Sequence, residues 1–395
     1  MIQSIQNLEV QSKICLVRVD YNVPQNEDLE ITDDKRIRES IPTIVSLISR
    51  GAKVVLMSHL GRPKGTFNSR YTLAPIARRL GELLHKEILF SSDCIGDTPI
   101  NIINQMSNGD IVLLENLRFY KEEEDNSQDF SSKLADLGDI YINDAFGTAH
   151  RAHASTEGIA KYFTQKAAGL LIEKELAYLD KAIHSPKRPL IAVLGGAKVS
   201  GKIDVINNLL PICDHILIGG GMMFTFLKAM GHHIGSSMVE NDRIDTALQL
   251  LHHSEFAEKL HIPTDTIVAS KFSNDADTMI VDCEDIPENW MGLDIGPKTI
   301  ERFSALLKQA GTVVWNGPMG VFEMPKFEHG TQSIAQTLAS ITSLGAITII
   351  GGGDSAAAIS KFGLEHSVSH VSTGGGASLE FLEGKILPGI LALEM

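Results

Sequence analysis

Cysteine is scarce in this sequence, and no stretch of it stays apolar for long. The four cysteines are Cys15, Cys94, Cys213 and Cys283. They form neither a CxxC pair nor a metal-ligand spacing, which favours reduced, buried thiols. No apolar run approaches the roughly 20 residues of a membrane-spanning helix, and the opening MIQSIQNLEV lacks a signal-peptide pattern. We therefore expect a cytoplasmic protein without disulfides or a membrane span.

The sequence also lacks an excess of positive charge. Its formal net charge is −14 at pH 7, which argues against a nucleic acid or an anionic membrane as partner. With 43% hydrophobic and 21% charged residues, the composition is that of an ordinary globular protein. At 395 residues the chain exceeds the usual size of a single core, so two domains are expected.

A short apolar run that ends in glycines recurs four times in the second half. These runs are Leu190–Gly196, Ile216–Gly221, Ile347–Gly353 and Val371–Gly376, each with a helix-like stretch behind it. Such runs are typical of buried parallel strands. Glycine lets a ligand approach the backbone, and a helix that begins there offers unpaired N–H groups to an anion. The pattern predicts a phosphate-rich ligand along one edge of an α/β sheet.

The first half alternates strand and helix patterns, which favours a parallel sheet wrapped by helices. The predicted strands are Ile14–Val19, Val54–Met57, Ile111–Leu114 and Ile140–Ile142. The predicted helices are Asp34–Ser49, ended by Gly51, and a stretch from Thr72 to Leu84. Charged and polar residues follow each strand, at the end where ligands of open α/β sheets bind.

Gly169–Ile183 is predicted to form one amphipathic helix, and Pro186 and Pro189 follow it before a new strand begins. We place the domain boundary near this helix. The charged run Lys121–Asp125 is interpreted as the solvated face of a loop and not as a site.

The first half also contains five arginines and three histidines in these polar segments. They are Arg18, Arg36, Arg62, Arg118 and Arg151, with His59, His150 and His153. Any one of these arginines is more often part of a surface ion pair, and a single histidine more often forms a structural hydrogen bond. Several arginines at successive strand ends of an acidic protein indicate an anionic ligand, because guanidinium groups match carboxylate and phosphate oxygens.

Two lysines stand in the segment Gly195–Lys202, GGAKVSGK. It comes close to a P-loop, but Ile203 replaces the Ser or Thr that a P-loop uses for magnesium. On a helix after the strand, Lys198 and Lys202 would share a face, where they would either meet phosphate or be solvated.

Two acidic residues of the second half have alternative roles. Asp354, in GGGDS, could cap a helix or hold magnesium beside a phosphate. Glu323, in WNGPMGVFE, could bind a ribose or be an ordinary surface acid. Without a Ser-His-Asp or Cys-His ordering or an HExxH motif, nothing requires a protein nucleophile. An anion site on one half and a phosphate site on the other indicate phosphoryl transfer, which depends on positioning and charge stabilisation.

These residues match a family: the chain resembles phosphoglycerate kinases over nearly its whole length. The motifs of the first half are RVDYNVP at Arg18–Pro24, DDKRIRESIPTI at Asp33–Ile44, SHLGRP at Ser58–Pro63, LLENLRF at Leu113–Phe119 and NDAFGTAHRAHAS at Asn143–Ser155. The second half adds GGAKVS, GGGM, LDIGPKT, WNGPMGVFE, GGGDS and STGGGASLE in order. So many long motifs in the right order are far more specific than one glycine pattern.

The resemblance implies an α/β fold of two doubly wound parallel-sheet domains that face a cleft and are joined by a helix. It implies a cytoplasmic monomer that uses Mg²⁺ and transfers a phosphoryl group reversibly between 1,3-bisphosphoglycerate and ADP, giving 3-phosphoglycerate and ATP. Residues 1–168 with 379–395 would bind 3-phosphoglycerate, and residues 169–378, including a connecting helix at 169–184, the nucleotide. Because both domains serve one transfer, we expect them to close, with hinges near Gly169–Leu176 and residue 378.

The resemblance also implies roles for single residues. The 3-phosphoglycerate site would comprise Asp20, Asn22, Arg36, His59, Arg62, Arg118 and Arg151. On the nucleotide side, Lys198 and Lys202 would contact phosphates, Asp354 magnesium and Glu323 the ribose, with Gly292, Asn316, Gly352, Gly353 and Ser355 lining the site. The catalytic set would be Arg36, Lys198, Gly353 and Gly376. The attacking substrate carboxylate is already ionised at neutral pH, so no general base is needed.

The chain departs from the family pattern at two places, and two other functions stay open. Tyr21 stands where Phe is common, and Gly201 where many relatives carry a charge; neither change removes a matched functional residue. One alternative is a P-loop-like NTPase, which the segment GGAKVSGK suggests and against which Ile203 argues. The other is a non-catalytic binding protein that shares the fold. An assay with 3-phosphoglycerate and magnesium ATP would separate the three.

Overall fold

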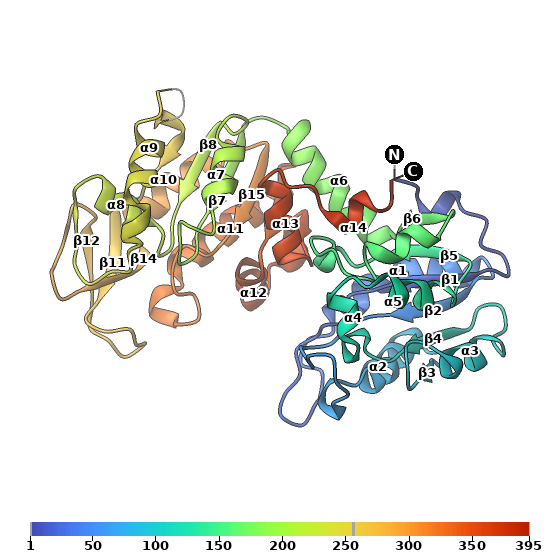
Figure 1. The fold of residues 1–395 in the computed structure, drawn as a ribbon. Helices are drawn as coiled ribbons and strands as arrows, with labels where there is room; N and C mark the ends of the chain where they lie inside the picture. The colour runs from blue at the N-terminus through green and yellow to red at the C-terminus, as the bar shows by residue number, and fades with distance from the viewer. Residues whose placement is uncertain (1, 255–256, 395) are drawn as a thin grey trace. The chain divides into compact units, whose positions relative to one another are not determined.

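The structure is a computed structural model that describes residues 2–254 and 257–394. The chain divides into two compact units, Met1–Ala177 with Ile386–Met395 and Tyr178–Lys385, and each contains its own parallel sheet (Figure 1). The division falls inside α6 (Leu170–His184) and after Lys385. The domain limits predicted at 168/169 and 378/379 stay a prediction, and their end residues Met1 and Met395 lie outside the described residues.

The first unit is built on six parallel strands in the order β3-β4-β2-β1-β5-β6. They are β1 (Ile14–Arg18), β2 (Lys53–Met57), β3 (Leu89–Ser91), β4 (Ile111–Leu114), β5 (Ile140–Asn143) and β6 (Lys166–Ala168). The four predicted strands are confirmed as β1, β2, β4 and β5. β3 and β6 have three residues each, which is too short for a hydrophobic pattern to reveal them.

The helices of this unit include both helices predicted from the first half of the sequence. They are α1 (Lys35–Ser49), α2 (Ala74–Leu84), α3 (Asp97–Ile103), α4 (Lys121–Glu124), α5 (Gln128–Ala135) and the first part of α6. α1 buries Ile37, Ile44 and Leu47 on the face that packs into the core of the unit. Gly51 follows at a φ of 76°, a left-handed conformation that glycine adopts without strain at the end of a helix.

Residues 386–394 also belong to the first unit. In α14 (Pro388–Leu391), the Gly389 N–H donates to the Ala149 carbonyl at 2.8 Å, and the Asn143 side chain donates to the Gly389 carbonyl at 3.2 Å. Ile2 and Glu394 form a β-bridge, so the two ends of the chain lie side by side (Figure 1). The end of the chain therefore supports the segment after β5.

The second unit has six parallel strands in the order β10-β8-β7-β15-β16-β17. They are β7 (Leu190–Leu194), β8 (His215–Ile218), β10 (Leu260–His261), β15 (Thr312–Asn316), β16 (Ile347–Gly351) and β17 (His370–Val371). The four glycine-ended runs are thereby confirmed as parallel strands. Helices follow them: α7 (Ile203–Leu209), α8 (Met223–Ala229), α12 (Gly353–Lys361) and α13 (Gly375–Leu382).

The sequence did not predict a smaller antiparallel sheet, ordered β12-β11-β14, in this unit. Its strands are β11 (Asp265–Ala269), β12 (Thr278–Asp282) and β14 (Met291–Ile295), and β9 (His233–Ile234) pairs separately with β13 (Asp285–Ile286). β12 is almost wholly exposed, so its sequence carries no alternation of buried and exposed residues. The remaining helices are α9 (Ile244–Leu251), α10 (Pro297–Leu307) and α11 (His329–Ser343).

Two further observations concern membrane-spanning helices and the cysteines. No helix among the described residues combines the length and the apolar character that crossing a membrane requires. The four cysteines are buried free thiols.

The closing segment offers a matched pair of leucines for testing its packing. Leu393 is fully buried, whereas Leu391 is 52% exposed. Leu393→Ala should lower the free energy of unfolding by about 2–5 kcal/mol, because it leaves a cavity in a packed site. Leu391→Ala should change it by no more than about 0.5 kcal/mol. Urea unfolding followed by circular dichroism measures both, and equal effects would contradict the packing of residues 386–394.

Candidate active site

The seven predicted substrate residues of the first unit lie near one edge of its sheet. Asp20 and Asn22 follow β1, His59 and Arg62 follow β2, Arg118 follows β4, Arg151 follows β5, and Arg36 lies in the first turn of α1. Because the strands are parallel, their carboxyl ends share this edge, where ligands of open α/β sheets bind.

Arg36 is held by the loop after β1. Its Nη1 donates to the Asp20 carboxylate at 2.9 Å and to the Asn22 carbonyl at 3.1 Å. The Asn22 side-chain oxygen accepts from the Gly61 N–H at 2.9 Å, which joins this loop to the one after β2. Since 34% of the Arg36 side chain is exposed, the guanidinium is anchored and still accessible to a ligand.

Asn116 joins the loops after β2 and β4, a role that sequence reasoning missed. Its side-chain oxygen accepts from the N–H groups of Leu60 at 3.2 Å and Arg118 at 3.0 Å. Its side-chain nitrogen donates to the carbonyls of Leu60 at 2.8 Å and Tyr71 at 2.9 Å. All four hydrogen-bonding positions of the amide are therefore used. Asn116 fixes the backbone that carries His59 and Arg118, and its only sequence signal was a polar residue after a strand.

Arg118 is a nearly buried cation. Its Nη1 donates to the Gly61 carbonyl at 2.9 Å, and its Nη2 lies 3.1 Å from the Glu124 carboxylate. Burial lowers the pKa of Arg118, and Glu124 acts in the opposite direction. Its Nε is buried without a hydrogen-bond partner among the described residues. A buried polar atom without a partner calls for an explanation, of which a functional role is one.

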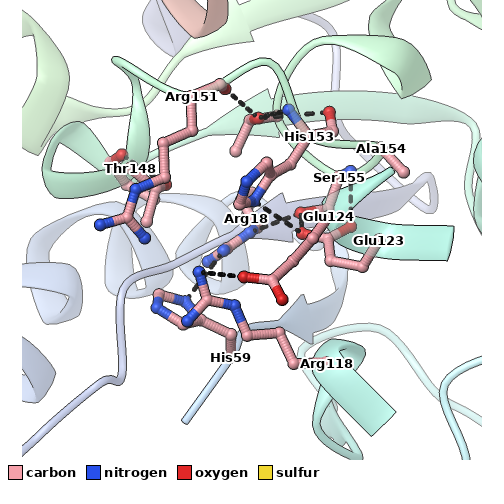
Figure 2. A network of polar contacts seen from close by, with 12 residues as sticks. Arg18, His59, Arg118, Glu123, Glu124, Thr148, Arg151, His153, Ala154 and Ser155 are labelled. Atoms are coloured by element: carbon pink, nitrogen blue, oxygen red, sulfur yellow. Dashed lines mark hydrogen bonds and ion pairs between the residues drawn. The ribbon is translucent and has the colours of Figure 1, made fainter. Parts of the chain in front are cut away.

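The prediction that Lys121–Asp125 forms a solvated loop face is right about the exposure of four of the five residues, but it is wrong about the loop and about Glu123. Residues 121–124 form α4, and Glu123 is fully buried, because its side chain turns inward beneath the arginines. Its carboxylate accepts from the N–H of Ser155 at 2.9 Å and from its hydroxyl at 2.6 Å (Figure 2). Buried Arg18 donates from Nε to the same hydroxyl at 2.8 Å. Burial raises the pKa of Glu123, whereas Arg18 and the hydrogen bonds from Ser155 act to lower it. Beside Arg18 the carboxylate serves as an internal counter-charge, which a run of acidic letters does not reveal.

Two of the three histidines of the cluster, His59 and His153, lie where burial and the arginines disfavour a positive charge. Burial, reinforced by Arg18 and other arginines, holds the pKa of His59 well below its usual value. Burial likewise lowers the pKa of His153 to about 4, and Arg118 and Arg18 add to this effect. His153 Nδ1 lies 4.0 Å from Glu123 Oε1, but a neutral imidazole forms no ion pair. The positive charge of the cluster therefore comes from arginine.

Arg62 and Arg151 are held less tightly. Arg62 is exposed, and its side chain makes no hydrogen bond or ion pair within the described chain. Arg151 is partly exposed, with Nε at 3.2 Å from His150 Nε2. Both guanidinium groups therefore have N–H donors to offer to an anion.

The second unit contains a cavity of about 550 Å³. Its apolar lining includes Phe224, Met238, Met291, Leu293, Met319 and Val321, and the predicted residues Gly292, Glu323 and Asp354 also line it. A Cβ atom on Gly292 would lie 2.0 Å from the Phe224 ring, so only glycine fits there. An apolar cavity with a few polar groups is typical of a small-molecule site.

The prediction that Lys198 and Lys202 share a helix face is wrong, because α7 begins only at Ile203 and residues 196–202 form bends and turns. Lys198 is exposed, whereas Lys202 is half-buried and donates to the Asn316 side-chain oxygen. Burial lowers the pKa of Lys202 to about 8, although Glu383 and Asp354 act to raise it. Asn316 is buried, and its Nδ2 has no partner among the described residues.

The beginnings of α12 and α13 lie together beside these residues. A Cβ atom on Gly375 would approach the Gly353 nitrogen to 3.0 Å, and one on Gly352 would approach the Asn316 side-chain oxygen to 3.2 Å. Asp354 and Gly376 are exposed in the first turns of the two helices. Two helix N-termini side by side favour an anion.

The side chain of Ser355, in contrast to the exposed Asp354, is used in a hydrogen bond within the protein. Its buried hydroxyl accepts from the Gly317 N–H at 2.6 Å. This bond fastens the start of α12 to the loop after β15. The prediction that Ser355 lines the nucleotide site stays a prediction.

The chain was compared with protein families and with known proteins. The family model described as phosphoglycerate kinase matches residues 5–385. The phosphoglycerate kinase of Microcystis aeruginosa (strain NIES-843 / IAM M-2473) is 54% identical, with 100% of this chain and 98% of the relative covered. That of Chlorobium phaeobacteroides (strain BS1) is also 54% identical, with 99% of each covered.

Solved structures give the same family. The phosphoglycerate kinase from Coxiella burnetii has a TM-score of 0.89 at 43% identity, with 100% of this chain and 99% of that chain covered. The enzyme from Pyrococcus horikoshii OT3 has a TM-score of 0.85 at 33% identity, with 100% and 98% covered.

Adjacent glutamates on α4 test the buried counter-charge. Glu123→Gln should lower the free energy of unfolding by about 3 kcal/mol, because it leaves buried Arg18 without this charge. Glu124→Gln removes an ion pair whose carboxylate is 44% exposed and should cost no more than about 1 kcal/mol. Denaturant unfolding at pH 7 compares them. A smaller effect at position 123 than at 124 would refute the role of Glu123.

Proposed function

The chain belongs to the phosphoglycerate kinase family, and from that premise we propose which of its residues carry out the reaction. The enzyme transfers a phosphoryl group reversibly between 1,3-bisphosphoglycerate and ADP, giving 3-phosphoglycerate and ATP, a step of glycolysis. Membership of this family does not favour the P-loop NTPase or the non-catalytic binding protein.

The proposed 3-phosphoglycerate site is the arginine cluster of the first unit. It comprises Asp20, Asn22, Arg36, His59, Arg62, Arg118 and Arg151. The observation that carries this assignment is the concentration of guanidinium groups at one sheet edge of an acidic protein, where Arg118 and the neighbouring Arg18 have little solvent contact. The substrate has a carboxylate and a phosphate, and guanidinium groups bind both through paired N–H donors.

Arg36 is proposed to act on the phosphoryl group in transfer. The substrate carboxylate, already ionised at neutral pH, attacks the γ-phosphorus of ATP in line, so no protein base removes a proton. Negative charge spreads over the transferring group, and Arg36 offsets it with a guanidinium that Asp20 holds in place. The neutral histidines of the cluster are consistent with a step that needs no base.

The nucleotide is proposed to bind in the second unit. The apolar cavity with Gly292 suits the base, Glu323 the ribose, and Lys198, Lys202 and Asn316 the phosphates. Gly352, Gly353, Asp354 and Ser355 form the start of α12. The backbone N–H groups of Gly353 and Gly376, at adjacent helix starts, are proposed to stabilise the moving phosphoryl group, together with Lys198.

The site is compatible with a magnesium ion that arrives with the nucleotide. Asp354 is exposed at the cavity, and magnesium is often bound through one or two carboxylates together with substrate phosphates. The described residues contain no group of three or more His, Cys, Asp or Glu side chains that could hold a metal, so the remaining ligands would be phosphate and water oxygens. Bound there, magnesium would neutralise phosphate charge.

We also propose that the enzyme acts as a monomer in the cytoplasm. Both proposed half-sites are supplied by this one chain, so the reaction needs no residue from a second copy. Its four cysteines are buried free thiols, which suits a reducing compartment.

Two arginines of α1 test the assignment of Arg36. Arg36→Ala should lower kcat by about 10²–10³-fold, while the KM for ATP changes little, because charge stabilisation in the transition state is lost. Arg38, on the same helix, is 54% exposed and paired with Asp34. Arg38→Ala should leave kcat within about twofold of the wild-type value. Steady-state kinetics with both substrates distinguishes the two, and an unchanged kcat in Arg36→Ala would remove that residue from the mechanism.

One transfer served by two units requires the proposed domain closure about the hinges near Gly169–Leu176 and residue 378. Small-angle X-ray scattering should therefore show a smaller radius of gyration with 3-phosphoglycerate and a non-hydrolysable magnesium nucleotide together than with either alone. An identical radius in all states would contradict closure.

A further inference from the structure

A chain of hydrogen bonds with fixed proton directions runs from Glu123 to Arg18. A guanidinium group can only donate, and an ionised carboxylate can only accept. Arg18 donates from Nε to the Ser155 hydroxyl at 2.8 Å, and that hydroxyl donates to Glu123 Oε1 at 2.6 Å (Figure 2). The only hydrogen of the Ser155 hydroxyl therefore points to Glu123, and its oxygen accepts from Arg18. These two bonds fix the orientation of the Arg18 guanidinium group.

The other end of Arg18 reaches His59. Arg18 Nη2 lies 3.1 Å from His59 Nδ1. Because Nη2 always carries hydrogen, this contact is a hydrogen bond only when Nδ1 is unprotonated. The ring proton must then lie on Nε2. No other hydrogen bond of this ring is found within the described chain, so the Nε2–H remains for a ligand.

Burial and the charges around His59 disfavour its protonated form. The side chain is 2% exposed, and Arg18, Arg118, Arg151 and Arg36 all disfavour a further positive charge on the ring. The carboxylates nearest to the cluster are engaged elsewhere: Glu123 with Ser155, Asp20 with Arg36 and Glu124 with Arg118. A second proton on Nδ1 would also face the Arg18 N–H groups directly.

Building on the proposed function, we infer that Arg18 is a positioning residue that locks His59 as the neutral tautomer with its proton on Nε2. Ser155 and Glu123 hold Arg18 in the orientation that this requires. His59 then recognises the 3-phosphoglycerate anion as a directional hydrogen-bond donor, while the arginines supply the charge. This division of roles explains why a histidine lies among the arginines. A neutral histidine donates a hydrogen bond in a defined direction and adds no positive charge that the arginines would repel.

The tautomer is measured directly on the intact, ligand-free protein. Nitrogen-15 NMR of protein labelled at histidine distinguishes protonated from unprotonated ring nitrogens, and His59→Gln identifies the His59 signals by their loss. We expect a protonated Nε2 and an unprotonated Nδ1, unchanged from about pH 6.5 to about pH 8. A proton on Nδ1, or an imidazolium near pH 7, would overturn the inference.

Two variants test the part played by Arg18. Arg18→Lys replaces the planar donor set by one ammonium group and should mix the two tautomers. It should raise the KM for 3-phosphoglycerate roughly tenfold, with kcat within about twofold and the KM for ATP unchanged. Ser155→Ala, which leaves Arg18 in the protein, should act in the same direction by roughly threefold.

Ser131→Ala is the matched control, because Ser131 is also buried in this unit but its hydroxyl contacts only the carbonyls of Ser127 at 2.8 Å and Ala154 at 3.4 Å, and neither Arg18 nor Glu123. It should change neither the tautomer nor either KM. If Arg18→Lys fails to fold, Ser155→Ala compared with Ser131→Ala decides the question. An unchanged tautomer and KM in Ser155→Ala would show that the chain of hydrogen bonds does not position His59.

Substitution of His59 itself separates this inference from the proposed substrate site. His59→Gln keeps an N–H donor near the position of Nε2 and should keep the KM for 3-phosphoglycerate within about threefold, whereas His59→Asn should raise it roughly tenfold. Equal KM values for the two, with the expected tautomer in the NMR spectrum, would overturn the substrate-binding role of His59 and leave the tautomer assignment standing.

Discussion

Repulsion among arginines packed at one sheet edge is the constraint on which the first unit depends. Arg18 and Arg118 have little solvent contact, and Arg36 and Arg151 act on the same histidine. At an effective dielectric constant near 20, two unit charges 4 Å apart interact by about 4 kcal/mol. Such a cluster is stable only with an internal counter-charge, which Glu123 provides, and a rigid backbone around it, which the hydrogen bonds of Asn116 provide. The charge left unbalanced is what an anionic substrate with a carboxylate and a phosphate would neutralise.

In the second unit, the charge is brought mainly by the proposed ligand, and the unit has few charged side chains of its own at the site. A nucleotide brings several negative charges and a large apolar base, so the unit offers an apolar cavity, two helix starts and the half-buried Lys202. Burial lowers the pKa of Lys202 to about 8, and an anionic phosphate beside it would favour its charged form. Both proposed sites thus lie at the carboxyl ends of parallel strands, one built on side-chain charge and the other mainly on backbone N–H groups.

The sequence predicted the parts of the fold that repeat or form a long pattern. Leu190–Gly196 and Ile347–Gly353 were recognisable because a buried strand has a continuous apolar run and its end needs glycine. The residues of β12 were not, because that strand is exposed and leaves no periodic signal. Glu123 was misread because the direction of one side chain within an acidic run depends on tertiary contacts with Ser155. Lys198 and Lys202 were misplaced because the start of α7 depends on local turns that spacing alone does not reveal.

The central claim is that positioned charge stabilises the transfer and that no protein base takes part. It is tested most directly by the pH dependence of kcat with saturating 3-phosphoglycerate and magnesium ATP, measured from about pH 6.5 to about pH 8. The account predicts a flat profile, because the attacking carboxylate stays ionised and His59 and His153 stay neutral over this range. A decline in kcat on the acid side with an apparent pKa near 6.5, abolished by substituting either histidine, would contradict it.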